Sequence, residues 1–328
     1  MFNPGASAEL IMASSIEEPT VSQTKPRPIA GWRRARVAAV IFGLGVPVLY
    51  SVICVMAALI LLSAPRTLSN QTPADSGLQF EGASFPSRAG AIPIAAWFIP
   101  GSSARAVVLV HGKGASRTKE FQGQFLKFAE DLHGRGFNVL DIDLRGHGAS
   151  GRAFITFGID EKGDIEAAVD WLKARGFNPS NIGVLGVSLG GASSIMAAAD
   201  DPDIAAVVAD SSYADIYPVI EGAWRRTSGL PEIFLYGSRL AAHAIVGFDV
   251  TTAKPVQVIS RISPRPVLLI HGAGDTLIPM SQAQQLKQAD TQAVLWQVPG
   301  VGHAGAYSAN PKQYVDTVTA FFDSKLGN

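Results

Sequence analysis

The sequence has little that would stabilise it by covalent or metal cross-links. It contains one cysteine, Cys54, among 328 residues, which excludes an intramolecular disulfide. No group of cysteines and histidines has the spacing of a structural zinc site. An excess of charge is also missing, because 27 Lys and Arg balance 27 Asp and Glu, so no basic field points to nucleic acid as a partner. The 47% hydrophobic content argues against a disordered chain.

Charge is entirely absent from residues 37–64, which are dominated by Val, Ile, Leu, Ala and Phe. A helix needs about 20 such residues to cross the hydrocarbon core of a bilayer, so this stretch predicts a transmembrane signal-anchor helix. Only Arg66 follows it before Arg88, whereas five basic residues precede it: Lys25, Arg27, Arg33, Arg34 and Arg36. The positive-inside rule then predicts a cytoplasmic N-terminus and a cell-membrane protein whose remaining chain is extracytoplasmic.

Two other interpretations of this apolar stretch stay open. A signal peptide has an apolar region of about 7 to 15 residues, and Pro65 follows the only small-residue site nearby. A buried core helix seldom remains uncharged over this length. The predicted organisation is therefore a polar cytoplasmic tail (1–36), the anchor (37–64), a linker (65–78) and a folded domain (79–328).

Short apolar runs alternate with helical periodicity along the folded domain. Strands are predicted at 106–110, 137–143, 182–187, 204–209, 266–270 and 293–298, and helices at 118–133, 161–175, 189–199, 281–289 and 311–325. This alternation predicts a largely parallel sheet with helices on both faces, and residues 78–85 and 91–98 are expected to pair antiparallel at one edge. Sites in such folds lie at the carboxyl ends of the strands.

A candidate nucleophile follows the strand at 182–187. Gly186-Val187-Ser188-Leu189-Gly190 forms a G-x-S-x-G pattern between this strand and a small-residue helix. A serine on so sharp a turn needs glycine two residues before and two after it, because a side chain there would meet the strand and the helix. The helix N-terminus favours negative charge beside the hydroxyl. An ordinary strand–helix turn is the alternative for Ser188.

A serine nucleophile needs a base, and the base needs an acid that orients it. His303, in the glycine-rich loop after the last predicted strand, is the candidate base. Asp275 follows the strand before that one and fits the chain order serine, acid, histidine. Asp210 is the second candidate for the acid, and a simple turn aspartate is the alternative for both.

Two backbone N–H groups are expected to stabilise the oxyanion of a tetrahedral intermediate. Leu189, directly after the serine, supplies one, and Lys113 in the loop after the strand at 106–110 supplies the other. The Lys113 side chain is interpreted as solvated, with binding of an anionic substrate group as the alternative. His147 precedes the serine in the chain and is interpreted as part of a structural turn in which Asp143 and Arg145 share a polar network.

Together these motifs resemble the α/β-hydrolase superfamily over roughly residues 80–325. They occur in family order as the His111-Gly112 loop, DLRGHGAS (143–150), GVSLGG (186–191), GAGDTLIP (272–279) and GVGH (300–303). The chain is similar to the Bem46-like and serine-aminopeptidase/lysophospholipase-like branch, whose members are often membrane-anchored. The resemblance implies an α/β-hydrolase fold with Ser188, Asp275 and His303 as the catalytic triad.

The expected function is hydrolysis of a small ester or lipid-like substrate through an acyl-enzyme, and no metal or organic cofactor is implied. The aromatic-rich insertion at 212–262 fits a short helical cap over Ser188, although packing against the sheet explains the same residues. A peptidase or amidase with the same triad is the alternative enzyme. A non-catalytic binding module on this fold is the alternative from another class.

Overall fold

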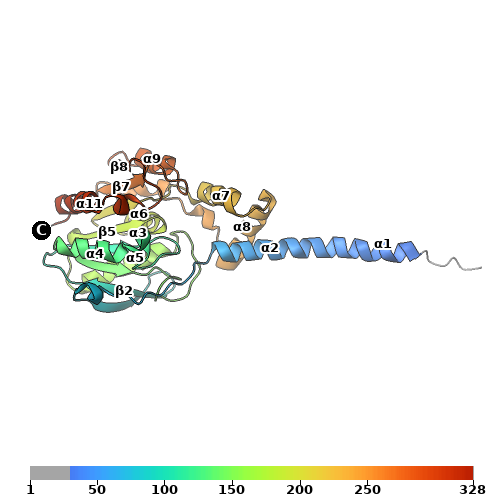
Figure 1. The fold of residues 1–328 in the computed structure, drawn as a ribbon, viewed down its shortest axis with the longest axis horizontal. Coiled ribbons are helices and arrows are strands. Elements are labelled where there is room, and N and C mark those ends of the chain that lie inside the picture. The colour runs from blue at the N-terminus through green and yellow to red at the C-terminus, as the bar shows by residue number, and fades with distance from the viewer. Residues whose placement is uncertain (1–29, 328) are drawn as a thin grey trace, which may run out of the picture. The chain divides into compact units, whose positions relative to one another are not determined.

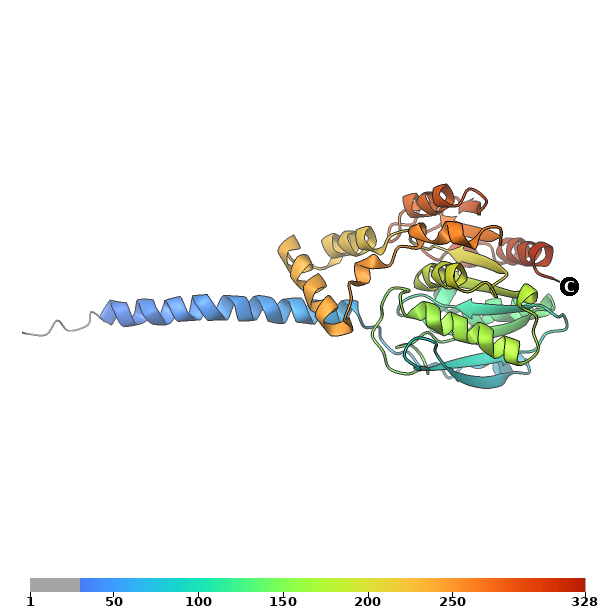
Figure 2. The same ribbon diagram turned by 180° about the vertical axis from the view of Figure 1, so that it is seen from behind.

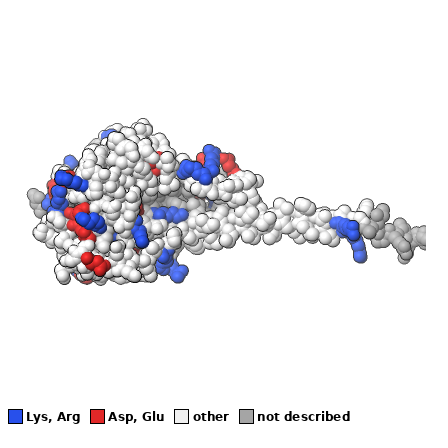
Figure 3. All heavy atoms as spheres, viewed as in Figure 1, with Lys and Arg blue, Asp and Glu red and all other residues white. Residues whose placement is uncertain are grey.

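The computed structural model describes residues 30–327, which fall into two units on either side of the boundary between Val48 and Leu49. The described part begins with the helical segments α1 (Ala30–Val40), η1 (Ile41–Gly45) and α2 (Val46–Leu61). They make one apolar helix over Gly31–Leu61, with a mean hydropathy of 2.5, that is long enough to cross a membrane. Beyond the basic residues at its start, the visible helix surface carries no charged side chain (Figure 3).

The second unit is built on an eight-stranded sheet with the order β1-β2-β4-β3-β5-β6-β7-β8. The strands are β1 (Glu81–Pro86), β2 (Pro93–Ile99), β3 (Ala106–Val110), β4 (Asn138–Ile142), β5 (Ile182–Val187), β6 (Ala206–Asp210), β7 (Val267–Gly272) and β8 (Val294–Val298). β2 pairs antiparallel with β1 and β4, and all other pairs are parallel. The largely parallel sheet with an antiparallel edge is therefore confirmed.

Helices cover both faces of this sheet (Figures 1 and 2). One face carries α3 (Glu120–Gly123), α4 (Phe125–Gly134), α10 (Ala306–Ala309) and α11 (Pro311–Lys325), and the other carries α5 (Glu161–Ala174), α6 (Leu189–Asp200) and α9 (Met280–Ala289). Because side chains alternate along a strand, each strand contributes to two cores. Val108 packs on the α5 and α6 side, whereas Val107 and Leu109 pack on the α4 and α11 side.

Residues 212–262 leave the sheet between β6 and β7. They form two α-helices, α7 (Ile216–Thr227) and α8 (Glu232–Val246), and three short 3-10 helices, η4 (Val250–Thr252), η5 (Pro255–Gln257) and η6 (Ile259–Ile262). The Asp215 side chain caps α7 by accepting the N–H of Tyr217, and α8 ends at Gly247 with a φ of 87°. This segment has the helical content that the sequence predicts.

One predicted helix differs from the structure. The helix expected at 118–133 is interrupted after Glu120, because Phe121 and Gln122 adopt φ values of 51° and 59°. The segment at 65–78, expected as a linker, contains the 3-10 helix η2 (Pro73–Ser76) and is fixed to the domain. Its Arg66 guanidinium donates hydrogen bonds to the carbonyl oxygens of Gly148 and Ser150. A further 3-10 helix, η3 (Pro179–Asn181), precedes β5.

Candidate active site

Ser188 occupies the sharp turn between β5 and α6. Its backbone has φ 54° and ψ −115°, a combination that a residue with a side chain adopts only when its surroundings enforce it. A Cβ atom on Gly186 would lie 2.2 Å from the carbonyl oxygen of Gly190, and one on Gly190 would lie 2.4 Å from that of Val110. Both glycines of the motif are therefore required by close backbone packing.

His303 and Asp275 meet at this serine. The His303 ring donates from Nδ1 to Asp275 Oδ2 at 2.7 Å, and its Nε2 lies 3.0 Å from Ser188 Oγ, within reach of the hydroxyl proton. The other carboxylate oxygen of Asp275 accepts the N–H groups of Leu277 and Ile278 at 2.9 and 2.8 Å. Three residues from three different loops thus form one hydrogen-bonded chain, in the geometry that activates a serine hydroxyl.

Asp210, the second candidate for the orienting acid, makes no hydrogen bond to His303. Its two oxygens accept the hydroxyls of Ser211 and Tyr314, each at 2.9 Å. Burial raises the pKa of Asp210 to about 6, against the opposing effect of these hydrogen bonds. The Ser211 hydroxyl also accepts the N–H of Ala304 at 3.0 Å. Asp210 is therefore linked through Ser211 to the residue that follows His303.

Glu120 is a carboxylate beside the site that the sequence analysis did not identify. Its Oε2 accepts the N–H of Gly112 at 2.6 Å, in the loop that follows β3. Burial raises the pKa of Glu120, although the hydrogen bond from Gly112 opposes this. Eight residues separate the two partners, and no local pattern marks this contact, because it depends on how the loop folds back at Phe121 and Gln122.

The electrostatic environment raises the pKa of His303. Burial alone lowers the pKa of this imidazole, but the hydrogen bond and the charge of Asp275 outweigh it, with smaller contributions from Asp210 and Glu120. The net result is a raised pKa. The imidazolium that forms when a base accepts a proton is therefore stabilised here.

The two expected oxyanion donors belong to segments that lie beside Ser188. Leu189 is the first residue of α6, and a Cβ atom on Gly112 would lie 3.1 Å from Ser188 Cβ, which places the loop of Lys113 against the serine. Within residues 30–327, the backbone N–H groups of Leu189 and Lys113 donate to no protein acceptor. Both remain available to a ligand.

Other polar residues of these loops hold the backbone in place. His147 Nε2 accepts the N–H of Gly114 at 3.1 Å, which agrees with its interpretation as a structural residue. The shared network expected for Asp143 and Arg145 is instead two networks, since Arg145 pairs with Asp164 at 2.7 Å and Asp143 pairs with Arg117 at 2.9 Å.

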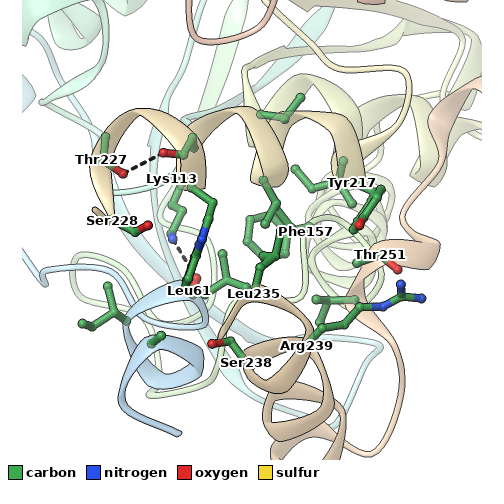
Figure 4. A pocket seen from close by; sticks show the side chains of 18 of the residues that line it. Leu61, Lys113, Phe157, Tyr217, Thr227, Ser228, Leu235, Ser238, Arg239 and Thr251 are labelled. Carbon is green, nitrogen blue, oxygen red and sulfur yellow. Dashed lines mark hydrogen bonds between the residues drawn. The ribbon is translucent and has the colours of Figure 1, made fainter. Parts of the chain in front are cut away.

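A cavity of about 540 Å³ opens beside Ser188, and its walls are mainly apolar. Residues of α7 and α8 line it together with Phe157 and Leu61 (Figure 4). Lys113 is exposed, as expected for a solvated side chain, and its ammonium donates to the carbonyl oxygen of Leu61 at 2.7 Å and lies 5.5 Å from the Phe157 ring. Its apolar surroundings lower the pKa of Lys113 to about 8.

Comparison with known proteins identifies the family. The family model described as the prolyl oligopeptidase family matches residues 124–328. The chain belongs to the prolyl oligopeptidase family. With its α/β-hydrolase fold, this membership confirms the expected superfamily of serine hydrolases. This family member is thus a hydrolase of the esterase or peptidase type.

The proteins that this chain is similar to include both a peptidase and an esterase. The uncharacterized protein YqkD of Bacillus subtilis is 30% identical over 210 residues, which are 61% of this chain and 66% of YqkD. Dipeptidyl peptidase family member 6 of Caenorhabditis elegans is 24% identical over 251 residues, 70% of this chain and 32% of that protein. The solved structure of the Pyrococcus furiosus esterase Pf2001 has a TM-score of 0.68 and 25% identity, covering 81% of this chain and 99% of that one.

Proposed function

We propose that this protein is a membrane-anchored serine hydrolase that cleaves carboxylic esters through an acyl-enzyme. The hydrogen-bonded series Ser188, His303 and Asp275 at the mouth of an apolar cavity carries the proposal. Ser188 Oγ attacks the ester carbonyl while His303 Nε2 accepts the hydroxyl proton, and Asp275 stabilises the imidazolium. His303 then returns the proton to the departing alcohol.

The second half of the reaction reuses the same groups. Water attacks the acyl-serine, His303 accepts a proton from it, and the carboxylic acid leaves as Ser188 regains its hydrogen. In both halves the oxyanion accepts hydrogen bonds from the backbone N–H groups of Leu189 and Lys113. Removing one such donor typically costs about 100- to 1000-fold in kcat, so these two groups are a major part of the proposed catalysis.

Ester cleavage is favoured over peptide cleavage by the chemistry of the cavity. A peptidase that recognises a free N-terminal ammonium needs a carboxylate to pair with it. Among the described residues that line the cavity there is no Asp or Glu, and its charged residues, Lys113 and Arg239, are cationic. The similarity to an esterase over 99% of that chain also supports this choice. Family membership and the dipeptidyl peptidase relative make amide cleavage the alternative.

Membrane anchoring is supported by the helix over Gly31–Leu61. Cleavage after Ala64 would remove Ala58 and Leu62, whose side chains are fully buried in the core that also contains the strands. Retention of the helix is therefore the more stable arrangement. We keep the predicted orientation, with the N-terminus in the cytoplasm and the hydrolase domain outside it, on the basic residues that precede the helix.

A matched pair of chromogenic substrates tests the proposal. The full-length protein in detergent is given p-nitrophenyl butyrate and the corresponding p-nitroanilide, beside a Ser188→Ala variant. We expect ester turnover at least 1000-fold above that of Ser188→Ala, and a kcat/KM for the anilide at least 100-fold below that for the ester. Faster anilide turnover would establish the amidase alternative instead.

A further inference from the structure

The last turns of the apolar helix belong to the folded domain. Within residues 49–328, the side chains of Cys54, Ala58 and Leu62 are 3%, 0% and 0% exposed. Cys54 and Ala58 lie on one face of α2, and Leu62 follows directly after the end of this helix. The N–H of Ile155 also donates to the Leu62 carbonyl oxygen at 2.8 Å. This end of the helix is fixed by the hydrolase core and is not a free tether.

The helix α8 packs directly on this part of α2. A Cβ atom on Gly237 would lie 2.3 Å from Cys54 Sγ and 2.4 Å from the Tyr50 hydroxyl, so only glycine permits the contact. The Tyr50 hydroxyl donates to the carbonyl oxygen of Ile233 at 2.8 Å. Away from this contact, α8 exposes a row of large side chains spaced three and four residues apart, namely Ile233 (62%), Tyr236 (56%) and Leu240 (73%).

The uncharged part of the helix indicates where the bilayer ends. It begins at Val37, directly after Arg36, which belongs to the cytoplasmic flank. About 20 residues at 1.5 Å per residue cover the hydrocarbon thickness of about 30 Å, so the span extends to about Met56. The turn from Ala57 to Leu61 then lies at the outer interface. Since α8 contacts Tyr50 and Cys54, it lies beside the outer end of the span.

These same turns form part of the wall of the cavity beside Ser188. Ala57, Ile60 and Leu61 line it, opposite residues of α7 and α8. Figure 4 shows Leu61, at the end of α2, facing the space that Leu235 and Phe157 also border. The hydrogen bond from Lys113 to the Leu61 carbonyl, dashed in that figure, joins the helix end to the loop of the proposed oxyanion donor.

We infer that the last two turns of the anchor helix are a wall of an acyl-binding pocket, and that the substrates are long-chain acyl esters that enter from the membrane interface. This inference rests on the proposed ester hydrolysis. The acyl chain occupies the apolar cavity while its carbonyl carbon reaches Ser188 Oγ. The ester C–O bond breaks, the alcohol leaves with a proton, and water later releases the fatty acid.

The test changes the wall and compares chain lengths. The full-length protein in phosphatidylcholine nanodiscs hydrolyses p-nitrophenyl acetate, butyrate, octanoate and laurate. For the wild type we expect kcat/KM to rise with chain length by up to about fourfold for each added methylene until the cavity is filled. Ala57→Trp places an indole in the cavity, and we expect it to lower the laurate-to-acetate ratio at least tenfold. Leu61→Ala enlarges the cavity and shifts the optimum to a longer chain.

Met56→Trp is the matched control, since Met56 is the preceding residue of α2, is 55% exposed and does not line the cavity. Its ratio and its acetate turnover are expected to equal those of the wild type. Suppose that acetate turnover depends on Ser188 but neither Ala57→Trp nor Leu61→Ala changes the chain-length profile. This result would overturn the acyl-pocket inference and leave the proposed ester hydrolysis standing. Absence of any Ser188-dependent ester turnover would instead reject the proposed function.

A lipid probe tests the route of entry. Monooleoylglycerol is incorporated into the same nanodiscs, and released fatty acid is measured. We expect release by the wild type and by Met56→Trp, with release by Ala57→Trp at least tenfold slower. If laurate ester is cleaved from solution but monooleoylglycerol in the nanodisc is not, entry from the membrane interface is wrong.

Discussion

Replacement of Asp275 by asparagine separates the two carboxylates that the sequence offers as the orienting acid. Asp275 Oδ2 accepts the Nδ1–H of His303 at 2.7 Å, and its side chain is fully buried. Asparagine keeps the size of the side chain and the acceptor for the two loop N–H groups. It turns an amide toward the ring, removes the negative charge, and favours the tautomer in which Nε2 carries the proton and cannot accept one.

The expected loss is large. A charge-assisted hydrogen bond of this kind contributes about 1.5 to 3 kcal/mol, and an unsuitable tautomer raises the total to about 5 kcal/mol, or roughly 10⁴-fold in kcat at 1.36 kcal/mol per factor of ten. The hydrogen bond and charge of Asp275 also raise the pKa of His303. The acid limb of the pH profile should therefore move to lower pH in Asp275→Asn.

Asp210→Asn is the control, because Asp210 contacts Ser211 and Tyr314 but not His303. We expect this variant to lower kcat by less than about 30-fold, or about 2 kcal/mol, because the loop that carries His303 loses part of its support. Both variants are assayed with p-nitrophenyl butyrate between pH 5 and pH 9, with circular dichroism to verify folding. If Asp210→Asn loses more activity than Asp275→Asn, the assignment of the acid is wrong.

Two further predictions concern carboxylates outside this triad. Glu120 helps to raise the pKa of His303. Because a base must be neutral to act, activity appears as the pH rises through that pKa. Glu120→Gln should therefore shift the acid limb of the kcat/KM profile to lower pH, and an unchanged limb would contradict the coupling between Glu120 and His303. Asp141 is buried with no hydrogen-bond partner among the described residues, and burial raises its pKa well above the ordinary value. As pH rises above about 4, the unfolded chain ionises while the folded one stays protonated, so stability falls. Asp141→Asn removes this loss, and its Tm should exceed that of the wild type by a margin that grows from pH 5 to pH 8; a constant margin would be inconsistent with a protonated Asp141.

The strands were predictable because buried parallel strands carry continuous apolar runs. The predicted spans 106–110 and 182–187 coincide with β3 and β5. The helix break at Phe121 and Gln122 was not predictable, since neither residue type favours a positive φ and the conformation depends on tertiary contacts. The sequence likewise has no local pattern for the contact from Gly112 to Glu120.

The candidate site was predictable where a backbone requirement fixes residue types at short spacing, as at Ser188 with its two glycines. The choice between Asp275 and Asp210 rested on chain order alone until the distances to His303 were known. The apolar helix shows the limit most clearly. On the sequence alone, a membrane anchor and a core helix are alternatives. A helix longer than the hydrocarbon thickness has enough residues for both, and α2 ends inside the core.

Covalent labelling of the proposed nucleophile tests the whole scheme at its first chemical step. The full-length protein in detergent is exposed to a fluorophosphonate beside Ser188→Ala, and intact masses are recorded. An activated Ser188, hydrogen-bonded to His303 at 3.0 Å, predicts one stoichiometric adduct on the wild type and none on the variant. A folded wild-type protein that stays unlabelled, or a variant that labels equally, would contradict a serine hydrolase and favour a binding module on this fold.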